Sequence, residues 1–133
     1  MLVRDLMQTN LRTVLGTQTV GEVIAALAEG HVSGLPVVDR HGRLEGVITA
    51  TDVLDALAEC EDAAARDTLL EDTLVQEIMT PRPQTITPDA TAKEAAQQLL
   101  YLEVHRLFVE EDGKLVGVIS TTDLVRALAA ERV

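Results

Sequence analysis

The chain has 133 residues, of which 47% are hydrophobic and only 2% aromatic, so one domain-sized aliphatic core is expected. The net charge of −11 argues against binding to nucleic acid or to an anionic membrane, because both depend on Lys and Arg. No apolar run approaches the length of a membrane span, and no secretory signal is visible. The single cysteine cannot form an internal disulfide, so we expect a cytoplasmic protein.

The sequence repeats itself once. VRDLM at residues 3–7 recurs as VQEIM at residues 75–79, an offset of 72. After one residue is lost in a turn, GVITATD at residues 46–52 recurs as GVISTTD at residues 117–123. A shared frame with one gap indicates an internal duplication and not chance similarity. The predicted organisation is a first repeat at 1–60, an acidic helical connector at 61–74 and a second repeat at 75–133.

Each repeat is predicted to open with a short strand and a helix. The strands lie around residues 13–15 and 85–86. Thr19 with Glu22, and Thr91 with Glu94, fit the capping box, in which a hydroxyl and a carboxylate satisfy free N–H groups at a helix start. Apolar residues then recur at helical spacing. We therefore predict helices from residue 19 to about 29 and from 91 to about 102.

Two strands and a closing helix complete each repeat. Polar turns carrying Gly42 and Gly113 are typical of hairpins. Each closing helix follows the aspartate of its duplicated motif and carries apolar residues that suggest a homodimer with a helical interface. The predicted strands are 34–38, 43–49, 106–110 and 114–120. The fold class is therefore α+β, with two pseudo-twofold related β-α-β-β-α repeats packed sheet to sheet.

The segment between the repeats is strongly acidic. Residues 55–72 hold seven acidic residues and one arginine, which gives −6 of the net −11. Alanines and leucines favour helix within it. A solvated helix face explains this charge most simply, and a docking surface for a basic partner is the alternative.

The duplicated aspartates, Asp52 and Asp123, allow two interpretations. Each lies three residues after a hydroxyl residue, Thr49 or Ser120, that ends a buried strand and begins a helix. Such a carboxylate can close a capping box. It can also accept hydrogen bonds from both hydroxyls of a ribose, while the helix N-terminus attracts a phosphate. An adenine would need an apolar slot, which Val14 or Ile86 could line.

The duplicated pattern resembles a tandem pair of cystathionine-beta-synthase (CBS) domains, known as a Bateman module. The resemblance covers nearly the whole chain. It is carried by Met7 and Met79, by SGLPVVD at residues 33–39, by HRLFV at residues 105–109 and by the two GVI-(T/S)-x-T-D motifs. The family implies a regulatory module that binds an adenosyl ligand in the cleft between repeats and signals to a separate partner. The implied candidate ligands are AMP, ADP, ATP and S-adenosylmethionine.

The resemblance also assigns roles to residues. It implies that Asp52 and Asp123 bind ribose, and that His105 and Arg106 reach the phosphates. The first repeat has Ser33 and Gly34 at the latter positions, so the Asp123 site is the better candidate for a phosphorylated ligand. The predicted ligand-binding residues are Thr13, Val14, Thr49, Thr51, Asp52, Thr85, Ile86, His105, Arg106, Ser120, Thr122 and Asp123.

No enzyme is predicted. The sequence contains no P-loop, GxGxxG, HExxH or GxSxG motif, and its histidines lack metal-ligand spacing. We therefore expect no catalytic residue and no metal, and a stand-alone module whose output passes to an unidentified effector protein. The alternative is a ligand-free interaction or oligomerisation scaffold in which both aspartates serve only as caps.

Overall fold

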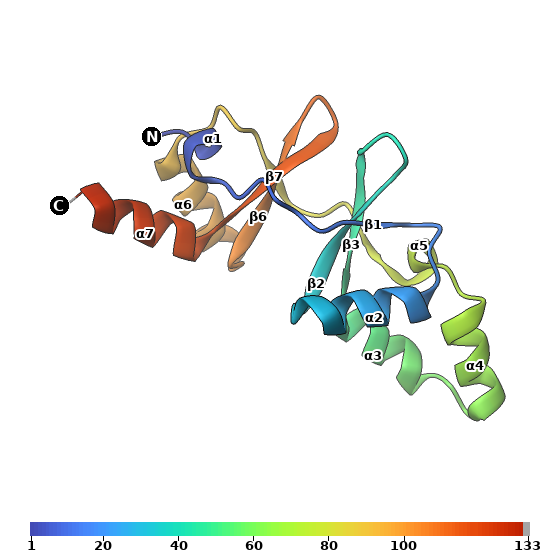
Figure 1. Ribbon diagram of the computed structural model, residues 1–133. Helices are drawn as coiled ribbons and strands as arrows, with labels where there is room; N and C mark the ends of the chain where they lie inside the picture. The colour runs from blue at the N-terminus through green and yellow to red at the C-terminus, as the bar shows by residue number, and fades with distance from the viewer. Residues whose placement is uncertain (132–133) are drawn as a thin grey trace. The chain divides into compact units, whose positions relative to one another are not determined.

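The computed structural model describes residues 1–131 and divides the chain into two compact units (Figure 1). One unit is the continuous segment Arg12–Pro83, and we call it the Asp52 unit. The other combines Met1–Leu11 with the chain from Gln84 onward, and we call it the Asp123 unit. Each unit contains the predicted strand-helix-strand-strand-helix order, so the expected α+β repeats are confirmed.

The Asp52 unit has a four-stranded sheet in the order β1-β2-β3-β4. β1 runs parallel to β2, and the remaining neighbours are antiparallel. In Figure 1, α2 and α3 lie side by side next to the β2–β3 hairpin. The strands are β1 (Val14–Leu15), β2 (Gly34–Val38), β3 (Leu44–Thr49) and β4 (Thr80–Pro81). The helices are α2 (Val20–Gly30), α3 (Ala50–Ala58), α4 (Ala63–Glu71) and α5 (Val75–Ile78).

The Asp123 unit repeats this plan with a three-stranded sheet in the order β5-β6-β7. β5 is parallel to β6, and β6 is antiparallel to β7. Helices α6 and α7 contact each other beside the sheet (Figure 1). The strands are β5 (Thr85–Ile86), β6 (Arg106–Glu111) and β7 (Lys114–Ser120). The helices are α1 (Val3–Leu6), α6 (Ala92–Leu102) and α7 (Thr121–Glu131).

The predicted helix starts at Thr19 and Thr91 are present. Thr19 Oγ1 accepts a hydrogen bond from the Glu22 amide (3.2 Å), and Thr91 Oγ1 accepts one from the Glu94 amide (3.1 Å). A side-chain hydrogen bond from Gln18, followed by the bond from Thr19, lowers the pKa of Glu22. Because these hydroxyls satisfy amides that have no partner in the helix, they fix where α2 and α6 begin.

Each unit has its own aliphatic core, as the low aromatic content predicts. All five residues of β2 are buried, and Ile48 and Ile119 at equivalent positions of β3 and β7 are fully buried. The core of the Asp52 unit comprises Val14, Val23, Ala26, Leu27, Leu35, Val37, Ile48, Val53 and Val75. That of the Asp123 unit comprises Val3, Ile86, Ala90, Ala95, Leu99, Leu107, Val109 and Ile119.

The two repeats exchange their leading segments. Val3, at the start of the first repeat, is fully buried in the core of the Asp123 unit, and its amide donates to the Ala90 carbonyl (2.8 Å). Val75, at the equivalent position of the second repeat, is fully buried in the core of the Asp52 unit and donates to the Gln18 carbonyl (2.8 Å). The compact units therefore cut across the sequence repeats at 1–60 and 75–133 instead of coinciding with them.

Helix α4 lies within the predicted acidic connector but also packs on the Asp52 unit. Leu69 is buried there. A Cβ on Gly21 of α2 would lie 2.8 Å from the Leu70 carbonyl oxygen, so a glycine is required where the two helices meet. The side chains of Asp62, Asp67 and Glu71 remain exposed to solvent.

Candidate functional site

Asp52 closes a capping box at the junction of β3 and α3. Thr49 is the N-cap, and its hydroxyl accepts a hydrogen bond from the Asp52 amide (3.1 Å). In return, the Thr49 amide donates to Asp52 Oδ2 (2.9 Å). Of the two interpretations that the sequence allows, the capping role is therefore present, and it occupies one oxygen of the carboxylate.

Asp123 makes the same arrangement at the junction of β7 and α7. The Ser120 amide and hydroxyl both donate to Asp123 Oδ2 at 2.9 Å, and the Asp123 amide donates to Ser120 Oγ (3.1 Å). Asp123 is only 8% exposed and is the buried charged residue of the described chain, whereas Asp52 is half-buried. The two carboxylates thus share a local geometry but differ in their access to solvent.

The exchanged segments supply a donor to the second oxygen of each carboxylate. Thr80 Oγ1 donates to Asp52 Oδ1 (3.0 Å), and Gln8 Nε2 donates to Asp123 Oδ1 (3.1 Å). Gln8 and Thr80 are equivalent in the repeat, one residue after Met7 and Met79. Sequence reasoning missed both donors, although the duplicated methionines mark the segments that carry them.

Two glycines allow these segments to reach the sheet. A Cβ on Gly46 would lie 2.7 Å from both Met79 Sδ and the Thr80 carbonyl oxygen. A Cβ on Gly117 would lie 2.7 Å from Met7 Sδ and 2.9 Å from the Gln8 carbonyl oxygen. The glycines of the duplicated GVI motif therefore serve close backbone approach, which positions Thr80 and Gln8 beside the aspartates.

His105 and Arg106 lie next to the N-terminus of α7. The His105 carbonyl accepts from the amide of Thr121, the first residue of the helix (2.9 Å), and Arg106 pairs with Ser120 across the β6–β7 ladder. Both side chains are exposed. In the Asp52 unit, Ser33 accepts from Ala50 in the same way (2.8 Å), and Gly34 pairs with Thr49. The predicted difference between the units is thus a difference in charge around otherwise equivalent helix starts.

The opening-strand residues are not brought to the aspartates within a unit. Val14 pairs with Val37 near the end of β2, whereas Thr49 pairs with Gly34 at its start, about 10 Å away along the strand. Val14 and Ile86 are 4% and 8% exposed and belong to the cores, while Thr13 is exposed and Thr85 half-buried. Thr51 and Thr122 are exposed in the first turns of α3 and α7.

This arrangement suits recognition of hydroxyl groups. Each carboxylate oxygen has two lone pairs, so Asp52 and Asp123 retain acceptor capacity beyond the bonds already made. Thr80 and Gln8 donate from side chains, so a ligand hydroxyl can replace them without breaking the capping box. The positive ends of the α3 and α7 helix dipoles favour an anion beside each carboxylate.

Comparison with known proteins identifies the family. The family model of the CBS domain matches residues 3–59 and again residues 75–130. The chain belongs to the CBS domain family. It is 31% identical to the chloroplastic CBS domain-containing protein CBSX2 of Arabidopsis thaliana over 89% of its own length and 58% of that protein. The predicted tandem CBS pair is confirmed.

Solved structures of CBS pairs share the fold. The crystal structure of CBSX2 in complex with AMP is 30% identical, with a TM-score of 0.82, and the match covers 99% of this chain and 98% of that one. The CBS domain pair of protein MJ0100, in complex with 5′-methylthioadenosine and S-adenosyl-L-methionine, is 25% identical with a TM-score of 0.74, over 98% of both chains. AMP and S-adenosylmethionine are thus ligands of neighbouring structures.

The CBS pair described here spans about half the length of the first curated relatives that it matches, from 43% to 59% of each. Within residues 1–131, no helix combines the length and apolar character that crossing a membrane requires.

Proposed function

We propose that this CBS domain pair is a regulatory module that binds an adenosyl ligand and signals to a separate effector protein. The observation that carries the proposal is the match to the AMP complex of CBSX2, at 30% identity over 99% of the chain. The duplicated aspartates support it, because each places a carboxylate at the start of a helix, where the helix dipole favours an anion. A ligand acts as a signal provided that it favours one arrangement of the protein over another.

In this proposal the ribose hydroxyls bind Asp52 and Asp123 and take the places of the Thr80 and Gln8 donors. The net charge of −11 opposes polyphosphates, so AMP or S-adenosylmethionine is favoured over ADP or ATP. The phosphate is assigned to the start of α7, with His105 and Arg106. The remaining assignments are Thr49, Thr51, Ser120 and Thr122 near the phosphate, and Thr13, Val14, Thr85 and Ile86 near the adenine.

Substituting the aspartates tests the ribose assignment. We expect AMP or S-adenosylmethionine to stabilise the wild-type protein by about 2.7 kcal/mol at roughly 100 times its dissociation constant. Asp52→Ala and Asp123→Ala should each lose the stabilisation that arises at the substituted site. Thermal-shift titrations with AMP, ADP, ATP, adenosine and S-adenosylmethionine measure both quantities.

The matched control is Asp62→Ala. Asp62 caps α4 by accepting from the Ala65 amide (2.8 Å), so this substitution removes a cap outside the proposed site. It should lower the free energy of unfolding by about 1 kcal/mol and leave the ligand-induced shift intact. An equal loss of shift in Asp62→Ala would assign the effect to capping and contradict the ribose assignment.

The second candidate function is a ligand-free scaffold. It is favoured by the capping boxes, because both carboxylates already have partners without any ligand. A scaffold would show no stabilisation by any of the five ligands even in the wild-type protein. It would still show loss of stability in both aspartate variants.

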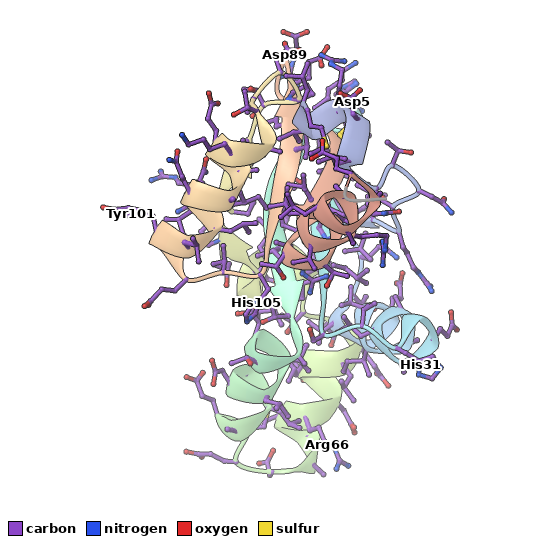
Figure 2. All side chains as sticks on the ribbon, turned by 90° about the vertical axis from the view of Figure 1, so that its left-hand side faces the viewer. Asp5, His31, Arg66, Asp89, Tyr101 and His105 are labelled. Atoms are coloured by element: carbon purple, nitrogen blue, oxygen red, sulfur yellow. The ribbon has the colours of Figure 1, made fainter. Side chains whose placement is uncertain are left out.

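We extend the proposal to a homodimer formed through the helices. Val125 and Leu128 on α7 are 65% and 57% exposed, and Leu54 on α3 is 62% exposed. On α6, Tyr101 is 87% exposed, and Figure 2 shows its side chain projecting away from the helix. Large apolar side chains in such numbers on the surface are typical of an interface, and a second copy of the chain is the occupant that we propose.

Introducing negative charges on α7 tests whether this helix forms the dimer interface. Val125→Glu with Leu128→Glu should give a monomer in sedimentation equilibrium at concentrations where the wild-type protein is dimeric, because association would bury unpaired carboxylates. Leu15→Glu is the control and should remain dimeric, because Leu15 is the exposed residue of β1 and lies outside the proposed helical interface. A wild-type monomer would refute the dimer and leave the ligand proposal unaffected.

The proposal contains no catalytic step and assigns the protein to the cytoplasm. The sequence lacks the nucleophile, P-loop and metal motifs of the common enzyme classes.

A further inference from the structure

The surroundings of the two carboxylates differ in charge one helical turn beyond each aspartate. Arg126 lies three residues after Asp123 on α7, and its Nη1 is 3.7 Å from Asp123 Oδ1. At the equivalent position of α3, three residues after Asp52, the chain has Asp55. Residues three apart on a helix are neighbours on its surface, so each carboxylate has a charged side chain beside it, of opposite sign in the two units.

We propose that Arg126 and Asp55 set the charge preference of the two sites, so that the Asp123 site takes a phosphorylated adenosyl ligand and the Asp52 site takes an uncharged or cationic one. The inference rests on the proposed function and adds the residues that decide which ligand each site accepts.

Arg126 is free to serve a ligand. Its side chain is 69% exposed, and its 3.7 Å approach to Asp123 is longer than a hydrogen bond, so its N–H donors remain available to a ligand. A 5′-phosphate belongs to the same nucleotide as the ribose assigned to Asp123, and charges closer than the Debye length of about 8–10 Å are not fully screened, so the guanidinium can attract it. Arg106, opposite Ser120, adds a second cation at the start of α7.

The Asp52 site lacks these cations. Ser33 and Gly34 replace His105 and Arg106, and Asp55 adds a negative charge. Arg82 belongs to the same unit, but it does not compensate. It follows β4, whose Thr80 and Pro81 pair with Val47 and Gly46, so the antiparallel direction carries Arg82 away from the start of α3.

Exchanging the two charges tests the inference at isolated sites. The Asp52→Ala background leaves only the Asp123 site. There, Arg126→Asp should lower the affinity for AMP, relative to that for adenosine, roughly tenfold, because the local charge changes by two units. In an Asp123→Ala background, which leaves only the Asp52 site, Asp55→Arg should raise the affinity for AMP, relative to that for adenosine, by a similar factor. Titration calorimetry with AMP and adenosine gives both ratios, and circular dichroism confirms that each variant is folded.

Control substitutions separate a local effect from a change in net charge. Arg66 and Asp67 lie on α4, outside both proposed sites, and Figure 2 labels Arg66 there. Arg66→Asp changes the net charge by as much as Arg126→Asp does, and Asp67→Arg by as much as Asp55→Arg does. Both controls should leave the ratio of AMP affinity to adenosine affinity unchanged. Both ratio changes should shrink in about 1 M salt, where screening is nearly complete.

The outcomes distinguish this inference from the proposed function. If adenosine binds but neither charge exchange alters the ratio of AMP affinity to adenosine affinity, the charge assignment is overturned and the adenosyl site is retained. The same conclusion follows if the α4 controls alter that ratio equally. Absence of adenosine binding at either isolated site also overturns the assignment. Absence of AMP, adenosine and S-adenosylmethionine binding to the wild-type protein overturns both.

Discussion

A fragment of residues 12–83 is expected to fold on its own, whereas a fragment of residues 1–60 is expected to remain unfolded. The first contains every strand and helix of the Asp52 unit, together with its whole core. The second follows the sequence repeat but loses α4, α5 and β4. It lacks the fully buried Val75 and the buried Leu69, and it leaves Val3 without its partners.

The size of the effect follows from the lost burial. Each removed core side chain contributes about 1.5–3 kcal/mol, and the total stability of a small domain is only about 5–15 kcal/mol. Domains of about 55–65 residues do fold alone, so the length of the 12–83 fragment is sufficient. Cooperative thermal unfolding, followed by far-ultraviolet circular dichroism, distinguishes a folded from an unfolded fragment.

A fragment of residues 12–60 controls for the unpaired N-terminal segment. It should also be unfolded, because the missing contacts come from residues 61–83. Cooperative unfolding of the 1–60 fragment, with none in the 12–83 fragment, would contradict the exchange of leading segments and favour units that coincide with the sequence repeats.

Adding a single methyl group at Gly46 or Gly117 is expected to destabilise the protein by about 1–3 kcal/mol or more, because overpacking at these positions displaces backbone. The new Cβ of Gly46→Ala would meet the Thr80 carbonyl oxygen at 2.7 Å, and that of Gly117→Ala would meet the Gln8 carbonyl oxygen at 2.9 Å. Urea denaturation of each variant measures the loss in the free energy of unfolding.

Gly30→Ala is the matched control for these substitutions. Its Cβ would meet only the side chain of Val32, with Cγ2 at an ordinary 3.4 Å and Cγ1 at 3.9 Å, near the end of α2. It should change the free energy of unfolding by a few tenths of a kcal/mol or stabilise the protein slightly. Equal effects at Gly30 and Gly46 would show that the leading segment does not press on β3. Combining Gly46→Ala with Met79→Ala should recover only part of the loss, because the Thr80 carbonyl remains.

Most of the local structure followed from the sequence. The hydroxyl residues Thr19, Thr49, Thr91 and Ser120 each cap the helix that the sequence assigns to them. The strands at 34–38 and 114–120 have the predicted limits. These features could be predicted because caps, turns and buried strands depend on residues only a few positions apart.

Parts of the candidate site could not be predicted. The sequence identified Asp52 and Asp123 but not the donors Thr80 and Gln8, which are 28 and 115 residues away in the chain. It could not show that Asp123 is buried while Asp52 is half-buried, since burial depends on which segment covers the residue. The sequence also could not show that the opening-strand residues Val14 and Ile86 belong to the two cores, and their assignment to an adenine slot stays a prediction.

The sequence by itself determined the duplication, the order of elements in each repeat, the aliphatic core and the paired aspartates. Only the tertiary structure decided which leading segment completes which unit. VRDLM and VQEIM are nearly equivalent, so each would fit either sheet, and no local pattern distinguishes the two pairings. The choice is made by contacts between distant parts of the chain, such as Val3 with Ala90 and Val75 with Gln18, which buried packing and backbone hydrogen bonds fix together.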